Sequence, residues 1–391
     1  MIDMQILIHA LIALVIAMAV CFSLSPVVKV FATKVGAIDV PKDNRRMHKQ
    51  PIPRLGGLAI FMGFMVSVLI MVPLTDQLRG MLFGAVIIVV LGVFDDVYAL
   101  GAKLKFVVQI VAALIAVFRG NVIDVLSNPN FFSSNPYWNL GWLSIPVTVI
   151  WIVAITNAVN LIDGLDGLAV GVSGISSIVL LVIALLVSDN SVAMIMAGLA
   201  GACLGFMPYN LNPAKMFMGD TGATFLGYTL AVMSIQGLFK LYTVISFIVP
   251  FLMLGLPIFD ISFAVIRRIS EGHSPMTPDR SHIHHRLIDM GMNQKQAVAV
   301  LYVVSAILGL TAVVLATTTA LRAMIFLLAV CATGIVVVKI VWKKPLEPVS
   351  EKENLEHTVE LPDLSELLYD TTELPDLAAI LEDKEEKADE S

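Results

Sequence analysis

The chain has 391 residues, of which 58% are hydrophobic and only 14% are charged, with a net charge of −6. Soluble domains carry about 25% charged residues, so this composition excludes an ordinary soluble protein and indicates a chain that crosses a membrane repeatedly. The mean hydropathy of +0.87 agrees with that class. Membrane lipids are therefore expected partners, and nucleic acid is not.

About eleven apolar runs approach the ~20 residues that a helix needs to cross a bilayer. The sequence thus predicts an all-α, polytopic integral membrane protein, with ten or twelve spans left open because the third and fourth runs are short. The predicted spans are 4–24, 55–74, 81–94, 104–118, 142–160, 170–187, 192–209, 222–238, 243–266, 297–318 and 321–342.

Lysine and arginine gather in alternate loops, which sets the expected orientation because cytoplasmic loops carry the excess of basic residues. The loops after the first, third, seventh and ninth spans are basic, as is the segment after the last span, and the loops between them are nearly bare. We therefore expect an external N-terminus, a cytoplasmic C-terminus and an active site on the cytoplasmic face. The first span has no basic segment before it, so we expect it to be retained rather than removed as a signal peptide.

The chain divides into a transmembrane domain, residues 1–345, and a strongly acidic cytoplasmic tail, residues 346–391. The tail has few apolar residues and is expected to be disordered. It contains the string Leu-Pro-Asp-Leu twice, at residues 361–364 and 374–377. This near repeat is either a docking motif for a protein partner or part of a solvated tail without an essential role.

The first cytoplasmic loop, residues 39–57, is basic, contains three prolines and ends in a glycine pair. Basic residues alone would only anchor the loop on the inner side of the membrane. Proline and glycine, however, fix a specific backbone path. We therefore expect Lys49 and Arg54 to contact a substrate phosphate, as a point charge and a planar fork respectively.

Two adjacent carboxylates, Asp95 and Asp96, follow the third predicted span directly. Their mutual repulsion makes them a poor choice for anchoring alone, and a divalent cation or a cationic partner would relieve it. On a helix the two side chains point about 100° apart. We expect one of them to face the active cleft while the other pairs with a neighbour such as Lys103 or Lys105.

The richest polar cluster, residues 157–167, overlaps the end of the fifth predicted span. Asn157, Asn160 and Asp163 share one helical face by their spacing, and the glycines of the cluster let the backbone approach a ligand closely. Asp163 and Asp166 are three residues apart and are expected to converge. Oxygen ligands of this kind suit Mg²⁺ or hydrogen bonds to the base and ribose of a nucleotide.

A fourth cluster, residues 210–222, contains Asn210, Asp220 and Thr221 and ends where the eighth span begins. Asp220 and Thr221 are good residues for capping that helix, and capping alone would explain them. A carboxylate beside a helix N-terminus can also hold a metal–diphosphate pair, with the metal on one side and amide N–H groups on the other.

The last loop concentrates four of the chain's seven histidines within residues 273–285. Such a tract resembles a zinc site, but the carboxylates elsewhere and the lack of nearby cysteines favour oxygen-bound Mg²⁺. Asp260, inside the ninth span, is expected to be a buried counter-ion. Charge-assisted hydrogen bonds to a diphosphate are expected from Arg280, His282, His284 and His285.

Five of these strings occur in the order found in the polyprenyl-phosphate N-acetylhexosamine-1-phosphate transferase family, which the chain resembles from about Asp39 to Gly291. Each string alone is weak, but five in order at one predicted face are highly specific. They are Pro-Arg-Leu-Gly-Gly at 53–57, Asp-Asp at 95–96, Asn-x-x-Asn-x-x-Asp-Gly-x-Asp-Gly-Leu at 157–168, Phe-Met-Gly-Asp-Thr-Gly at 217–222 and His-x-His-His-Arg-Leu at 282–287.

The resemblance implies a reaction in which a polyprenyl phosphate attacks the β-phosphorus of a UDP-N-acetylhexosamine, giving a polyprenyl-diphospho-sugar and UMP. It implies Mg²⁺, or Mn²⁺ in its place, bound by Asp220 with Asn210 nearby and Asp96 in support. It gives Asp95 the task of deprotonating or orienting the lipid phosphate. The remaining residues that it places at the substrates are Lys49, Asn157, Asn160, Asp163, Asp166, His282, His284 and His285.

The forms of the first-loop and histidine motifs are similar to those of the bacterial branch that starts teichoic acid, O-antigen or related glycopolymers. We therefore expect UDP-N-acetylglucosamine and undecaprenyl phosphate as substrates, in a bacterial plasma membrane. UDP-N-acetylgalactosamine and the UDP-muramyl pentapeptide stay open as donors, although the muramyl branch usually has Pro-Thr-Met-Gly-Gly in the first loop. A homodimer also stays open. A transporter would place its charges near mid-span in paired halves, whereas the carboxylates here crowd at one face.

Overall fold

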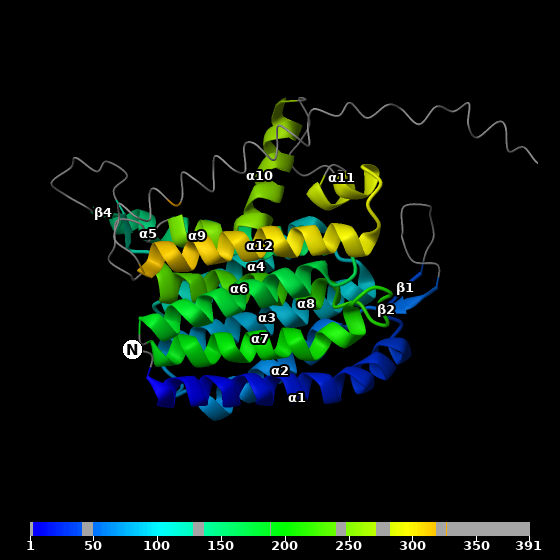
Figure 1. Cartoon of the computed structure of the whole chain (residues 1–391), viewed down its shortest axis with the longest axis horizontal. Helices are drawn as coiled ribbons and strands as arrows, with labels where there is room; N and C mark the ends of the chain where they lie inside the picture. Colours follow the sequence, from blue (N-terminus) through cyan, green and yellow to red (C-terminus); the bar gives the residue numbers. More distant parts are fainter. Residues whose placement is uncertain are drawn as a thin grey trace, which may run out of the picture. The chain divides into compact units, whose positions relative to one another are not determined.

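Long apolar helices make up most of the computed structural model, which describes residues 3–40, 50–127, 137–187, 189–239, 248–270, 282–317 and 326. Most of these helices lie alongside one another (Figure 1). They are α1 (Met4–Lys34), α2 (Gly56–Met71), α3 (Asp76–Tyr98), α4 (Ala102–Phe118), the 3₁₀ turn η1 (Gly141–Leu143), α5 (Ser144–Leu161), α6 (Leu168–Leu186), α7 (Asn190–Asn210), α8 (Gly219–Ser234), the π-helical turn η2 (Ile235–Phe239), α9 (Ile248–Met253), α10 (Gly255–Ser270), α11 (Ile283–Asp289) and α12 (Gln294–Thr317).

Six helices in the described part of the chain are long and apolar enough to cross a membrane, and α2 is a shorter apolar helix. Every predicted span from 4–24 to 222–238 corresponds to a helix, and α1 continues past its predicted end to Lys34. The all-α membrane architecture is therefore confirmed. The predicted span 321–342, apart from residue 326, and the acidic tail lie outside the described residues, so the total of eleven spans stays a prediction.

The predicted span 243–266 differs from the structure, which divides its described part into α9 and α10. Helical geometry is interrupted at Leu254, just before Gly255 and Pro257. Glycine weakens a helix interior, and proline removes a backbone donor and clashes with the preceding turn, so the run bends there. Beyond the bend, α10 points away from the direction of α12 (Figure 1).

Successive helices from α1 to α8 reverse direction, so alternate loops meet at one end of the bundle. We call this end, which carries β1 and β2 in Figure 1, the site end. Backbone hydrogen bonds join loops there that are far apart in sequence, from Gly56 N to Phe217 O (2.9 Å) and from Gly57 N to Met218 O (2.8 Å). The polar clusters predicted for separate loops are thereby brought together.

Helix α8 lies at the centre of the bundle, since every residue from Thr221 to Ser234 is buried. It packs against α2, α3 and α5. A Cβ added to Gly57 of α2 would lie 2.0 Å from the backbone nitrogen of Gly222, and one added to Gly92 of α3 would lie 2.4 Å from the Cα of Thr221. Small residues let helices in membranes approach this closely, so these two glycines bring α2 and α3 onto the first turn of α8.

Two short antiparallel ribbons add to the predicted helical architecture. Strand β1 (Ile38–Asp39) pairs with β2 (Ile52–Pro53), with Ile38 opposite Pro53. This ribbon closes the base of the first predicted loop and presents residues 50–54 at the site end. Strand β3 (Val125–Ser127) pairs with β4 (Tyr137–Asn139) between α4 and α5.

Replacement of Gly57 by alanine should disrupt the crossing of α2 and α8. The added methyl group would meet the backbone of Gly222 and Thr221 rather than a side chain that can rotate away. Overpacking of this kind costs on the order of 1–3 kcal/mol, so we expect a lower apparent unfolding temperature in detergent at a fixed heating rate. Gly101→Ala is the matched control, since nothing lies within 4 Å of a Cβ added there. Equal effects of the two variants would contradict the close crossing.

Candidate active site

A cavity of about 910 Å³ lies at the site end of the bundle. Its wall collects residues from α1, β1, β2, α3, α5, α7, α8, α11, α12 and the connecting loops. Its charged and amide side chains are Lys29, Asp39, Gln50, Arg54, Asp96, Asn160, Asp163, Asp166, Asn210, Asn212, Lys215, Asp220, His285 and Gln294. Two predicted substrate-binding residues, Lys49 and Arg280, lie outside the described residues.

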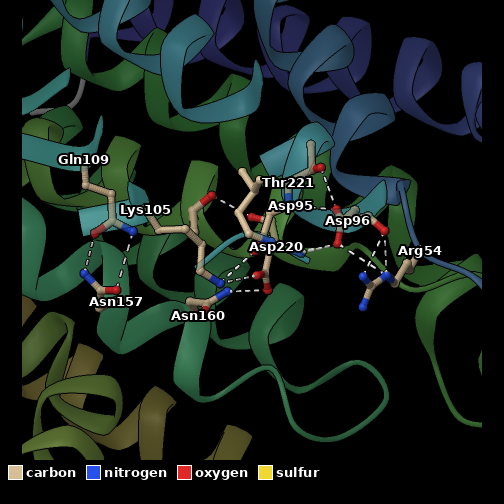
Figure 2. A network of polar contacts seen from close by, with 11 residues as sticks. Arg54, Asp95, Asp96, Lys105, Gln109, Asn157, Asn160, Asp220 and Thr221 are labelled. Atoms are coloured by element: carbon tan, nitrogen blue, oxygen red, sulfur yellow. Dashed lines mark hydrogen bonds and ion pairs between the residues drawn. The ribbon is translucent and has the colours of Figure 1, made fainter. Parts of the chain in front are cut away.

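Asp220 is the residue on which several elements converge. It stands in the first turn of α8, where its Oδ1 accepts a hydrogen bond from Asn160 Nδ2 of α5 (2.9 Å) and its Oδ2 accepts one from Lys105 Nζ of α4 (3.0 Å). Figure 2 shows this network of polar contacts. The Asp220 side chain keeps 36% of its surface exposed, so one edge of this carboxylate still faces the cavity.

Asp95 lies beside Asp220 but is directed toward Lys105. Its Oδ2 accepts from Lys105 Nζ (2.7 Å), and its Oδ1 accepts from the backbone N–H of Leu100 (2.7 Å). The latter bond is possible because Ala99 ends α3 in the left-handed conformation, with φ 52°, which turns the chain back over the helix end. The predicted pairing of one of the two adjacent aspartates with Lys105 is thus present, and the aspartate is Asp95.

Asp96 points in another direction and accepts hydrogen bonds from the N-terminus of α8. Its Oδ1 accepts from Asp220 N (3.0 Å), and its Oδ2 accepts from Thr221 N (3.1 Å) and Thr221 Oγ1 (2.6 Å). The first N–H groups of a helix have no partner inside the helix, and a carboxylate there is also stabilised by the helix dipole. This geometry favours a structural role for Asp96 over the metal-supporting role expected from the sequence.

Arg54 reinforces this contact from the other side. Its Nε and Nη2 donate to the backbone carbonyl of Asp96 (3.1 and 2.9 Å), and Nε lies 3.8 Å from Asp96 Oδ1. Arg54 also lines the cavity. Arg54 therefore joins the first loop to α3, and the part of its side chain that faces the cavity is available for the predicted contact with a phosphate.

The side chains of Asn157 and Asn160 have different partners, although their spacing predicted that both lie on one helical face. Asn157 Nδ2 donates to Gln109 Oε1 of α4 (2.6 Å) and to Val153 O (2.8 Å), and the side chain does not line the cavity. Three helical residues turn the direction by about 300°, so side chains at i and i+3 diverge by about 60°. Asn160 consequently reaches Asp220, whereas Asn157 braces α5 against α4.

Lys105 and Gln109 take part in the site beyond what was predicted from the sequence. Lys105 was expected only as a partner of one aspartate, and Gln109 was not considered. Their spacing of four residues inside the apolar run 104–118 was the available signal, because i and i+4 share one helical face. Polar side chains on one face of an otherwise apolar span indicate that this face is turned toward the protein interior.

Asp166 and Asn210 fasten the loops that form the cavity wall. Asp166 Oδ2 accepts from Asn212 Nδ2 (2.9 Å) and Ala214 N (3.0 Å). Asn210 is buried, accepts from Gly167 N (3.2 Å) and donates to Met216 O (3.1 Å). Both residues line the cavity, but their hydrogen bonds run within the protein, so they shape the pocket.

Asp163 differs from Asp166 and Asn210, because its side chain makes no hydrogen bond within the described part of the protein. It lines the cavity, and its carboxyl group has no hydrogen-bond or ion-pair partner among the described residues. Burial, together with the negative charges of Asp220, Asp96 and Asp166, raises the pKa of Asp163 to about 8. A cation in the cavity would favour its ionised form.

The histidine motif contributes mainly to local structure. Asp260 Oδ2 is 2.8 Å from His282 Nδ1, and Asp260 Oδ1 accepts from Ile283 N (2.8 Å), so this buried aspartate fixes the start of α11. A Cβ on Gly164 would lie 2.2 Å from His284 Nε2. Burial lowers the pKa of His284 to about 4, so this ring is neutral at pH 7. Of the three predicted histidines, only His285 lines the cavity.

The donor atoms at the cavity suit a hard cation. No group of three His, Cys, Asp or Glu side chains in the described ranges could hold a metal alone. Mg²⁺, however, is usually bound through one or two carboxylates together with substrate phosphates. Asp220 and Asp163 both line the cavity and offer such oxygens, so the residues fit a cation that enters with a diphosphate.

Asp96→Asn should destabilise the protein. Asparagine has one acceptor oxygen and would turn an NH₂ group toward the N–H donors of α8. Leaving a buried donor unpaired costs on the order of 1–3 kcal/mol, so we expect a lower apparent unfolding temperature at pH 7. The control is Asp124→Asn, because Asp124 is exposed. An unfolding temperature equal to that of the control would contradict the capping role.

Asp163→Asn should stabilise the protein, in contrast to Asp96→Asn. The folded-state pKa of Asp163 is about 8, above the ordinary value of 3.8, so the folded protein retains this proton where the unfolded chain loses it. Asp163 therefore reduces stability as the pH rises from about 4 to 8. We expect the unfolding temperature of the variant to exceed that of the parent by a margin that grows between pH 5 and pH 8. A margin independent of pH would contradict the raised pKa.

The chain matches known proteins over most of its length, and a profile of glycosyl transferase family 4 matches residues 78–238. The probable undecaprenyl-phosphate N-acetylglucosaminyl 1-phosphate transferase of Bacillus subtilis is 42% identical over 314 residues, covering 80% of this chain and 87% of the relative. The decaprenyl-phosphate N-acetylglucosaminephosphotransferase of Mycobacterium tuberculosis is 33% identical over 328 residues, covering 75% and 79%. Together with the order of the five motifs, this similarity shows that the chain belongs to the polyprenyl-phosphate N-acetylhexosamine-1-phosphate transferase family.

Proposed function

We propose that the protein transfers N-acetylglucosamine-1-phosphate from UDP-N-acetylglucosamine to undecaprenyl phosphate, in a reaction that depends on Mg²⁺. The observation that carries this proposal is the carboxylate of Asp220, which faces a cavity at the end of a membrane helix bundle and contacts Lys105 and Asn160. The name of the relative from Bacillus subtilis supports the same sugar and lipid.

The chemistry exchanges one phosphoanhydride bond for another. An oxygen of the lipid phosphate bonds to the β-phosphorus of the donor, the bond from that phosphorus to the bridging oxygen breaks, and UMP leaves with the electron pair. Phosphoryl transfer of this kind depends mainly on positioning and charge neutralisation. Mg²⁺, when bound, would supply neutralisation at the diphosphate oxygens, held by Asp220 and Asp163.

Asp95 acts in this scheme by orienting Lys105 more than by accepting a proton. Both of its oxygens already accept hydrogen bonds, from Lys105 Nζ and from Leu100 N. A phosphate monoester has a second pKa of about 6 and is mostly dianionic at pH 7, so the lipid phosphate needs no strong base. Asn160 holds Asp220 Oδ1 and thereby fixes the direction of the carboxylate.

The cavity agrees with a nucleotide sugar in size and chemistry. Pockets for small molecules commonly measure about 300–1,000 Å³, and this one measures about 910 Å³. Arg54 and Lys215 line it alongside the carboxylates, which supports recognition of an anionic donor. UDP-N-acetylgalactosamine and the UDP-muramyl pentapeptide are the alternative donors.

The placement of the site in the membrane is a further part of the proposal. Arg54, Lys105 and Lys215 lie at the site end, and each belongs to or adjoins a predicted basic loop, which favours the cytoplasmic face for the site and for the C-terminus. We infer eleven spans with the N-terminus outside, in a bacterial plasma membrane, and a product that feeds a glycopolymer of the cell envelope. Teichoic acid and O-antigen both agree with the motif forms.

The test is an assay of the purified protein with undecaprenyl phosphate, Mg²⁺ and labelled UDP-N-acetylglucosamine. We expect label in the lipid fraction and an equal amount of UMP, both lost on chelation. Asp220→Asn should lower turnover by at least 100-fold and more than Asp95→Asn does, because metal binding matters more than proton acceptance. Asp124→Asn, at an exposed position, is the control and should match the parent.

Each alternative outcome has a distinct meaning. Turnover only with another UDP-sugar would retain the mechanism and replace the donor. A larger loss in Asp95→Asn than in Asp220→Asn would give Asp95 the role of an essential base. Absence of turnover with every UDP-sugar would reject the proposed reaction.

A further inference from the structure

The ammonium group of Lys105 lies between the carboxylates of Asp95 and Asp220. Its ammonium nitrogen lies 2.7 Å from Asp95 Oδ2 and 3.0 Å from Asp220 Oδ2 (Figure 2). Two carboxylates that share one neighbour at this distance would repel each other strongly without an intervening positive charge. The lysine therefore acts as an internal counter-ion for both carboxylates in the free protein.

Lys105 occupies one of the two carboxylate oxygens of Asp220, Oδ2, which a metal ion could otherwise use. Asp220 Oδ1 already accepts from Asn160 Nδ2 (2.9 Å), and Oδ2 is the atom that Lys105 contacts (3.0 Å). A divalent cation that bound Asp220 through Oδ2 would meet the ammonium group at the same oxygen. Two cations at this oxygen repel each other, so a metal ion bound through Oδ2 would favour withdrawal of Lys105 from Asp220.

Lys105 is suited to such a movement. A lysine carries a compact charge on a flexible four-carbon stem, with three donors that can change partner. The side chain of Lys105 is 29% exposed, and its second partner, Asp95, is itself held by Leu100 N (2.7 Å). When the ammonium leaves Asp220, Asp95 can therefore keep it beside the site.

We propose that Lys105 competes with the divalent cation for Asp220 and makes cation binding depend on the nucleotide sugar. This inference rests on the proposed function. In the free enzyme Lys105 neutralises Asp220 and weakens its affinity for the cation. The diphosphate of the donor brings additional oxygen ligands for the cation and an alternative anionic partner for the displaced ammonium group. Cation and donor consequently bind with positive cooperativity, and each raises the affinity for the other by the same factor.

The test measures Mn²⁺ binding, by electron paramagnetic resonance of the free ion, to the full-length protein in detergent. For the parent we expect the affinity for Mn²⁺ to be at least about tenfold higher with saturating UDP-N-acetylglucosamine than without it. In Lys105→Met we expect affinity without nucleotide to rise about tenfold and the effect of the nucleotide to shrink. Turnover of this variant should fall, because Lys105 also contacts the reacting region.

Lys103→Met is the matched control. It removes the same charge from the same helix, two residues away, at an exposed position, and should leave Mn²⁺ affinity unchanged with and without the nucleotide. Lys105→Gln is the second neutral variant, and should repeat the effect of Lys105→Met if the methionine variant fails to fold.

Two results would overturn the proposal. One is an unchanged Mn²⁺ affinity in both neutral variants without nucleotide, and the other is a parent enzyme in which Mn²⁺ and the nucleotide bind independently. Either result, obtained with a parent that turns over UDP-N-acetylglucosamine, would reject the competition and leave the reaction standing. If the Mn²⁺ affinities of the parent and of the Lys105 variants show the expected competition, but the parent turns over no UDP-sugar, the proposed reaction would be rejected and the competition would stand.

Discussion

The arrangement of the site depends on the contact between the Asp96 carboxylate and the N-terminus of α8. A helix that begins inside a tightly packed bundle needs acceptors for its first N–H groups, because these groups have no partner within the helix. Asp96 supplies these acceptors from α3 and so fixes where α8 begins. Asp220 belongs to that first turn, and its direction follows from the same contact. The contact is possible only because Gly57 and Gly92 allow α2 and α3 to approach α8 at backbone distance.

The helical part of the fold was predictable because apolar run length is a direct consequence of bilayer thickness. The bend between α9 and α10 was missed, since an apolar run stays apolar across Gly255 and Pro257 even where the backbone turns. The two ribbons were also missed. Their strands are two or three residues long, too short for any alternation of apolar and polar side chains to be visible in the sequence.

The site was predictable as a set of clusters but not as a set of roles. Adjacent aspartates on a helix diverge by about 100°, and only the positions of α4 and α8 decide that Asp95 turns to Lys105 and Asp96 to Thr221. The histidine motif was expected at a diphosphate because of its charge and because of the family resemblance. In the structure His282 contacts Asp260, which lies 22 residues earlier. Asp260 was expected to be a buried counter-ion, but its pairing with His282 was not predicted.

The hydrogen bonds that each side chain makes within the protein distinguish the residues that build the cavity from those that can contact a ligand in it. Asp96, Asp166 and Asn210 accept or donate within the protein, and replacing them would first alter the scaffold. Asp163 has no such partner in the described part of the chain, and Asp220 keeps an exposed edge. Buried carboxylates without partners reduce stability, and proteins commonly retain such groups where function requires them. Asp163 and the exposed edge of Asp220 are thus well placed to receive a cation and a diphosphate.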